Sequence, residues 1–266
     1  MSDSHQQYFD ANKEGWNKRT EIHKMSSFYN LEAFKKGLTS LNKIEIDEVG
    51  SVKGKSLLHL QCHFGMDTLS WARAGATVTG IDLSDIAIKL AKEINDELQL
   101  NGRFVTCNVN DTSLHIAEQF DIVFTSYGTI GWLPDLAPWA KVIAEKLLPG
   151  GFFYIADFHP TLWMMDDNME KLTYSYFNDE VIITEQKGTY ADRNAPLTYK
   201  EYGWNHPFSE IISALINEGL QIQFLHEFPY SPYNCFANLK QGTDGMWRLK
   251  EMDNKFPMMY SLKAVK

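Results

Sequence analysis

Short apolar runs alternate with amphipathic stretches along the chain from about residue 55 to residue 160. Five short runs predict strands, and they are Ser56–Leu60, Ala76–Ile81, Arg103–Cys107, Phe120–Ser126 and Phe152–Ala156. The fourth is apolar almost without interruption, which predicts a strand buried on both faces. Three stretches between them have helical spacing, and they are Leu69–Ala74, Ser84–Leu98 and Pro134–Leu147. Ser84 suits an N-cap, and Pro134 suits the first turn of a helix. Strands that alternate with helices predict a parallel sheet with right-handed crossovers.

The flanking regions follow other patterns. Residues 1–50 are polar and aromatic, with apolar side chains at three- and four-residue steps that predict two or three short helices. Residues 161–203 interrupt the alternation, and within them Thr173–Phe177 and Glu180–Tyr190 predict a hairpin around Asn178-Asp179. The alternation then resumes with a predicted helix at Pro207–Glu218 and strands at Leu220–Phe228 and Met258–Ala264.

Composition narrows the class of protein. The 266 residues carry a formal charge of −9, which argues against broad contact with nucleic acid. Three widely spaced cysteines, Cys62, Cys107 and Cys235, form no pattern typical of a disulfide framework or a zinc site. Neither a signal peptide nor a membrane-spanning apolar stretch is visible, so we expect a reduced, cytoplasmic protein. The oligomeric state stays open.

The end of the first predicted strand is where a ligand is expected. Open α/β sheets bind ligands at the carboxyl ends of their strands. The turn there runs from His59 to Thr68 and contains only Gly65, whereas nucleotide-binding turns usually contain several glycines. Asp82 ends the second strand, 17 residues after Gly65, a spacing close to that of ribose-binding acids. Helix capping would explain an Asp at this position equally well.

Several ordered motifs together resemble one family. The runs LLHLQCHFGMDTLSWARAGATVTGIDLSDIAIKLAKE, FVTCNVND, FDIVFTSYGTIGWLPDL and LLPGGFFYIADFHP are similar to class I, Rossmann-like methyltransferases that use S-adenosylmethionine on small molecules. The resemblance covers about residues 52–160, and the tail from Trp204 also fits. It implies a doubly wound, mostly parallel seven-stranded α/β sheet that ends in an antiparallel pair. Residues 51–266 would form this domain, with an insertion at 161–203 and an N-terminal helical lid at 1–50.

The resemblance also implies a role for each matching position. The first turn would face the methionine part of the cofactor, Asp82 would hold the ribose hydroxyls, and Leu83 would pack on adenine. Asn108 would meet the adenine amino group, and the end of the fourth strand would form the pocket floor. Pro149-Gly150-Gly151 would make a tight turn into the fifth strand. The implied cofactor-binding residues are Gln61, Cys62, His63, Gly65, Asp82, Leu83, Asn108, Val109, Ser126 and Tyr127.

The first turn departs from the family pattern of an acid and three alternating glycines. His59, Gln61 and His63 replace the acid and two of the glycines. Gln61 and His63 would be strained at positive φ. We therefore expect a slightly different turn, in which these side chains bond the cofactor's carboxylate or amine. Loss of cofactor binding is the alternative.

The expected reaction is in-line methyl transfer to a small-molecule oxygen or nitrogen. A hydroxyl acceptor needs a base, for which His159 is the first candidate and His206 the second. Asp157 would orient His159, although His159 could instead simply bond its own loop. Aromatic faces attract the cofactor's sulfonium, and the candidates are Tyr127, Trp132, Trp16 and Trp204.

Two other functions are alternatives to methyl transfer. One is a non-catalytic cofactor-binding module of the same fold, and another is a nicotinamide-dependent oxidoreductase. The second is disfavoured because a pyrophosphate needs the bare backbone of a glycine-rich turn. A metal site at Asp157 and His159 is not expected, because no third ligand has a suitable spacing.

Overall fold

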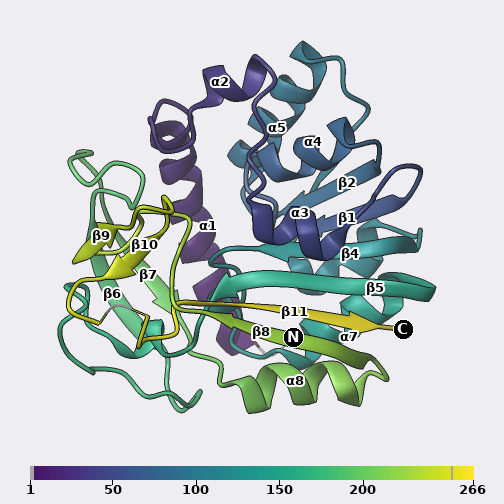
Figure 1. The fold of residues 1–266 in the computed structure, drawn as a ribbon. Coiled ribbons are helices and arrows are strands. Elements are labelled where there is room, and N and C mark those ends of the chain that lie inside the picture. The colour runs from purple at the N-terminus through teal and green to yellow at the C-terminus, as the bar shows by residue number, and fades with distance from the viewer. Residues whose placement is uncertain (1–2, 253) are drawn as a thin grey trace.

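A seven-stranded sheet forms the centre of the computed structural model, which describes residues 3–252 and 254–266 (Figure 1). The strand order is β3-β2-β1-β4-β5-β11-β8. β11 runs antiparallel to both β5 and β8, whereas β1 to β5 pair in parallel. The expected sheet with its closing antiparallel pair is therefore confirmed. The strands are β1 Ser56–Leu60, β2 Thr77–Asp82, β3 Arg103–Thr106, β4 Phe120–Ser126, β5 Leu147–Phe158, β8 Gln221–Phe228 and β11 Met259–Val265.

Helices cover both faces of this sheet, which is why its central strands β1, β4 and β5 are buried along most of their length. Leu58 and Leu60 of β1 pack with Trp139 on one face, while Leu57 packs with Trp71 on the other. The helices of this domain are α4 Met66–Arg73, α5 Asp85–Glu97, α6 Thr112–His115, α7 Ala137–Lys146 and α8 Phe208–Asn217. Ser84 caps α5 as predicted, because its side chain accepts a hydrogen bond from the Ala87 backbone N–H.

Two predicted details of this domain are wrong. α7 begins at Ala137 instead of Pro134, and the proline in its first turn is Pro138. The expected turn at Pro149-Gly150-Gly151 lies inside β5, where it produces an irregularity in the pairing. Phe120 pairs with Leu147 but Ile122 pairs with Phe152, so β5 holds extra residues at this point.

The N-terminal region contains three helices, and the first is much longer than predicted. α1 spans Asp3–His23, α2 spans Leu31–Lys35 and α3 spans Lys43–Val49. α1 runs between the sheet domain and the smaller strands (Figure 1). Asn12 attaches it to β7 (Thr198–Gly203), because its side-chain amide donates to the Tyr202 carbonyl (2.8 Å) and accepts from the Tyr202 N–H (3.1 Å).

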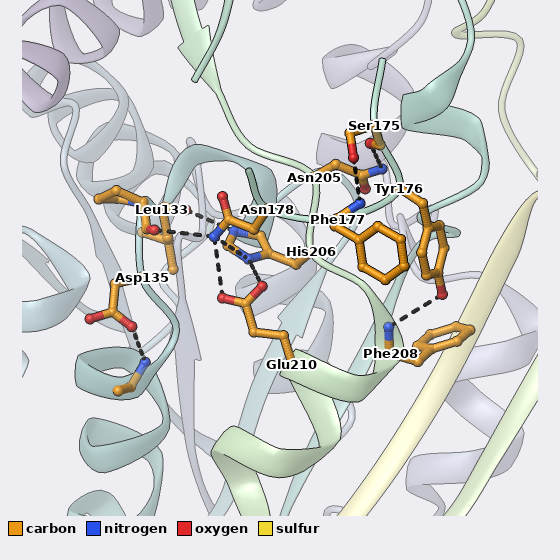
Figure 2. A network of polar contacts seen from close by, with 12 residues as sticks. Leu133, Asp135, Ser175, Tyr176, Phe177, Asn178, Asn205, His206, Phe208 and Glu210 are labelled. Carbon is orange, nitrogen blue, oxygen red and sulfur yellow. Dashed lines mark hydrogen bonds and ion pairs between the residues drawn. The ribbon is translucent and has the colours of Figure 1, made fainter. Parts of the chain in front are cut away.

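The insertion also differs from its predicted form. β7 pairs with β6 (Ile182–Lys187), and 188–197 connect them, whereas 173–177 form no strand of this hairpin. Asn178 does not make the turn of a hairpin. Its amide instead donates to the Pro134 carbonyl and to Glu210 of α8, which attaches the loop to the sheet domain (Figure 2). A second small pair, β9 (Leu239–Gln241) and β10 (Trp247–Leu249), was not predicted.

Within the described ranges, no helix has the length and apolarity needed to cross a membrane.

Candidate functional site

Two cavities lie at the carboxyl ends of the central strands. The smaller one has a volume of about 90 Å³ and is lined by the ends of β1 and β2, the segments after β3 and β4, and one face of α1. The larger one has a volume of about 850 Å³, and its wall contains many aromatic side chains beside polar and charged ones. Trp16, Tyr127, Gly128 and Trp132 line both cavities, so the two adjoin there.

Most of the predicted cofactor residues meet at these cavities. The smaller cavity is lined by Gln61, Asp82, Leu83, Asn108, Val109 and Tyr127. Ser126 lines the larger cavity beside Tyr127. Cys62, His63 and Gly65 line neither. Gly65 is required by packing, since a Cβ there would lie 2.6 Å from the Phe104 ring.

The turn after β1 has the positive φ values typical of a glycine-rich turn, although only one of its three such residues is glycine. Gln61, His63 and Gly65 have φ values of 55°, 51° and 77°. The expected change of turn is therefore wrong. A left-handed conformation costs a non-glycine residue about 1–2 kcal/mol, and contacts of the two side chains hold it in place. Gln61 donates to the Thr129 carbonyl (2.8 Å), and the His63 ring meets His23 of α1 at 3.0 Å.

His63 therefore faces α1 and not the smaller cavity. Burial, followed by the charge of Arg19, lowers the pKa of His23 to about 3. Burial likewise lowers the pKa of His63, so the two rings are neutral and share one N–H. The His63 side chain attaches the first turn to the N-terminal helix.

Asp82 lines the smaller cavity and also fixes the backbone on both sides of it, at His63 and at Ser84. Its Oδ2 accepts from the His63 N–H and its Oδ1 from the Ser84 N–H, both at 2.8 Å. Burial raises the pKa of Asp82 to about 6, although these backbone hydrogen bonds lower it. Each oxygen can still accept another hydrogen bond. Helix capping, which the sequence left as an alternative role for Asp82, belongs to Ser84, so Asp82 keeps acceptor capacity for a ligand.

The chain's own polar atoms fit an S-adenosylmethionine molecule at this site. Gln61 Oε1 is buried in the cavity wall and has no partner among the described residues, so it can accept from a ligand. Asn108 shapes the turn after β3, where its side-chain oxygen accepts from the Asn110 N–H (3.0 Å). With Asp82, these groups offer acceptors for the ribose hydroxyls and the amines of the cofactor.

Arg19 is a site residue that sequence reasoning missed. It is 3% exposed, lines the larger cavity, and forms an ion pair with Glu201 of β7. Its guanidinium lies 4.6 Å from the Trp16 ring centre and 5.2 Å from that of Trp132. Its Nε has no partner among the described residues. The signal was its position three residues after Trp16, on the same face of one helix.

Among the four aromatic candidates, Trp204 differs in position. Trp16 and Trp132 meet edge to face, with ring centres 5.4 Å apart, and lie with Tyr127 where the cavities join. Trp204 lines only the larger cavity, where it packs against Tyr8 of α1.

The two histidines predicted as bases lie outside both cavity linings. His159 is 4% exposed, with Nε2 2.8 Å from Glu227 and Nδ1 accepting from the Thr161 N–H (3.1 Å). His206 lies between the Leu133 carbonyl and Glu210 (Figure 2). All four ring nitrogens are thus bonded within the protein, and the geometry does not bring either ring to a substrate.

Asp157 is also occupied elsewhere. Its carboxylate accepts from the backbone N–H groups of Gly128 and Thr129, and so holds the loop after β4 instead of orienting His159. Across residues 3–252 and 254–266, no group of three or more His, Cys, Asp or Glu side chains is arranged to hold a metal ion.

Part of the chain matches a known protein family. Residues 58–153, which span β1 to the middle of β5, match the family described as methyltransferase domain. The chain is 25% identical over 209 residues to a ubiquinone biosynthesis O-methyltransferase of Saccharophagus degradans, covering 77% of this chain and 81% of that protein. It is 29% identical over 146 residues to the protein of the same name from Escherichia fergusonii, covering 53% of this chain and 60% of that protein.

Solved structures share the fold. A putative S-adenosylmethionine-dependent methyltransferase from Listeria monocytogenes matches with a TM-score of 0.58 and 21% identity, over 84% of this chain and 97% of that one. One from Mesorhizobium loti matches with a TM-score of 0.58 and 19% identity, over 87% and 100%. The family match shows a methyltransferase domain at residues 58–153, and the solved structures show the fold. Together these findings support the class I S-adenosylmethionine-dependent methyltransferase that the sequence predicted.

Proposed function

We propose that the protein moves a methyl group from S-adenosylmethionine to a hydroxyl oxygen of a small, largely aromatic or apolar molecule bound in the larger cavity. The observation that carries this proposal is the junction of the two cavities at Trp16, Tyr127, Gly128 and Trp132. A cofactor bound along the smaller cavity would present its methyl group at this junction. The acceptor would approach from the opposite side, as in-line displacement requires.

The wall of the larger cavity supports an aromatic or apolar acceptor. A volume of about 850 Å³ lies in the upper part of the range for small-molecule sites, and such sites are mostly apolar with a few polar groups. Phe158, Trp163 and Phe236 form one wall, with ring centres 4.7–5.9 Å apart. The names of the relatives support oxygen as the accepting atom.

Different residues of the chain would bind different parts of the cofactor. Asp82 would accept from the ribose hydroxyls, and Gln61 Oε1 from an amine or hydroxyl. Arg19 would hold the methionine carboxylate with its unpartnered Nε, since it lies beside the cavity junction. Tyr127, Trp16 and Trp132 would place aromatic faces near the positive sulfur. The bound cofactor supplies an electrophilic methyl group.

Residues 1–50 and the insertion at 161–203 would act as a lid over the methyltransferase domain. Trp16 and Arg19 of α1, and Tyr199 and Glu201 of β7, line the larger cavity. The Asn12–Tyr202 hydrogen bonds join these two segments beside the smaller cavity, which Asn12 lines. A closed lid excludes water, which would otherwise surround the acceptor oxygen. The cytoplasmic location and the lack of nucleic-acid contact remain predictions.

Two measurements test this proposal. Calorimetry with S-adenosylhomocysteine should show binding, and wild-type protein supplied with S-adenosylmethionine should methylate members of a panel of simple phenols. Matched anilines and thiophenols serve as controls for the accepting atom. Methylation of the nitrogen or sulfur compounds alone, detected by mass spectrometry, would contradict transfer to oxygen.

A further inference from the structure

We propose that Asp67 is the general base of the reaction and takes the proton of the acceptor hydroxyl during methyl transfer. This inference rests on the proposed transfer to oxygen. It replaces His159 and His206 in that role, because their rings do not line either cavity.

Asp67 lies close to the point where the two cavities join. It stands in the first turn of α4, directly after the turn that begins at Gln61, and it lines the larger cavity. Its Oδ2 accepts a hydrogen bond from the Ser126 hydroxyl at 3.1 Å. Ser126 precedes Tyr127, which lines both cavities. The carboxylate is therefore placed beside the region in which methyl transfer is expected.

The carboxylate of Asp67 keeps capacity for a substrate. Its Oδ1 accepts from the Ser40 hydroxyl at 2.6 Å, so both of its side-chain partners are neutral hydroxyls. Among the described residues, no Lys or Arg forms an ion pair with it. A carboxylate can accept about four hydrogen bonds. Burial raises the pKa of Asp67, which strengthens it as a base, while the Ser40 and Ser126 hydroxyls lower it.

The other carboxylates that line the larger cavity are committed or exposed. Glu201 is ion-paired with Arg19. Asp166 accepts from the backbone N–H groups of Glu170 (2.8 Å) and Lys171 (3.2 Å), and Asp167 is exposed. Among these carboxylates, Asp67 is enclosed, and within the described part of the chain it forms no ion pair with a cation and accepts no hydrogen bond from a backbone N–H group.

The titratable groups that face Asp67 are neutral near pH 7. Burial, followed by repulsion from Asp67, raises the pKa of Glu45 on α3 to about 8. Burial raises the pKa of Tyr29 and of Tyr233 well above the usual range, with Asp67 adding to both. Because these groups are uncharged, none of them repels an ionised Asp67. Burial therefore remains the cause that raises the pKa of Asp67 and makes it a stronger base.

The step balances as a simple displacement. The acceptor O–H bond breaks and its proton passes to a carboxylate oxygen of Asp67. The acceptor oxygen bonds to the methyl carbon as that carbon's bond to sulfur breaks, and the electron pair of the broken bond stays on sulfur. The products are a methyl ether, neutral S-adenosylhomocysteine and a protonated Asp67. Asp67 returns its proton to water when the products leave.

Single-turnover kinetics with S-adenosylmethionine and catechol test the assignment across a pH series. Wild type, Asp67→Asn and Asp67→Glu are compared, with Asp47→Asn on α3 as the control for the same change of charge at an exposed position. Asp67→Asn should slow methyl transfer by about 10²–10⁴-fold. The wild-type rate should rise with pH as Asp67 ionises, and this rise should be absent from Asp67→Asn. Its affinity for S-adenosylhomocysteine should stay within about twofold of wild type, and Asp67→Glu should restore part of the rate. The control should match wild type.

Different results overturn different claims. A wild-type rate in Asp67→Asn, or an unchanged pH profile, removes Asp67 as the base while transfer to oxygen stands. A loss of cofactor affinity with an unchanged rate at saturating cofactor makes Asp67 a cofactor contact and overturns the inference. Methylation of anilines but of no phenol by the wild type overturns the proposed function itself, and the inference with it. Thermal unfolding of each variant establishes that it is folded.

Discussion

The cofactor side and the acceptor side of the cleft are built in different ways. The smaller cavity lies on neighbouring strand ends and is bordered by one face of α1. Its central groups, Asp82 and Asn108, are positioned by backbone hydrogen bonds within two residues or across neighbouring strands. The larger cavity is assembled from segments far apart in the chain, as the pairing of Arg19 with Glu201 shows. The first kind of site depends on the fold, whereas the second depends on tertiary contacts that can change while the sheet stays intact.

Replacement of Asp82 should have the largest effect on the cofactor side while leaving the acceptor side unchanged. Asp82→Ala should weaken S-adenosylhomocysteine binding by about 1–3 kcal/mol, the loss expected when hydrogen bonds to a buried diol disappear. Because Asp82 does not line the larger cavity, the KM for a phenol acceptor should not change when cofactor is saturating. Calorimetry and steady-state kinetics measure the two quantities. An unchanged affinity would mean that the ribose binds elsewhere.

The reciprocal change is on the acceptor side. Trp163 lines only the larger cavity and packs edge to face with Phe158 and Phe236. Trp163→Ala should raise the KM for a phenol acceptor about tenfold, because an aromatic contact contributes about 0.5–1.5 kcal/mol beyond its buried area. Cofactor affinity should stay at the wild-type value. A parallel loss of cofactor affinity would show that the two sides are not independent.

A substitution of His159 tests whether this buried histidine contributes to cofactor binding or catalysis, or only to stability. His159→Gln should lower the free energy of unfolding by about 1 kcal/mol, since hydrogen bonds to Glu227 and Thr161 are altered. The rate of methyl transfer and the cofactor affinity should both match wild type. Chemical denaturation and single-turnover kinetics decide. A rate loss of 10²-fold or more would return His159 to the catalytic role that the sequence suggested.

The smallest effect concerns the turn after β1. Gln61→Gly should be more stable than Gln61→Ala by about 1 kcal/mol, because glycine accepts a φ of 55° without steric cost. Both variants lose the hydrogen bond to Thr129, so their comparison isolates the backbone. Urea denaturation of the pair gives the difference. Equal stabilities would mean that the surroundings relieve the strain in another way.

The sequence predicted the parts of the molecule whose signals are local. Strand ends, the Ser84 cap and the position of Asp82 follow from periodicity and capping within a few residues. The hairpin of the insertion was misplaced because Asn178-Asp179 has turn chemistry, yet Asn178 bonds Glu210 from another element. The surroundings of His159 were missed for the same reason, since its partner Glu227 lies 68 residues away. Such distant contacts leave no periodic signal in one sequence.

The backbone of the first turn has a consequence for tracing ancestry. Gln61 and His63 keep left-handed conformations that glycine adopts freely, so a glycine pattern describes dihedral angles and only indirectly the residues that adopt them. A substitution at such a position succeeds when a new contact, such as that of His63 with His23, compensates its conformational cost. A motif written in glycines no longer matches a sequence that has acquired such contacts, although the turn keeps the same backbone conformation. Distant members of this fold are better recognised by the backbone dihedral angles of this turn than by the residue types that usually occupy it.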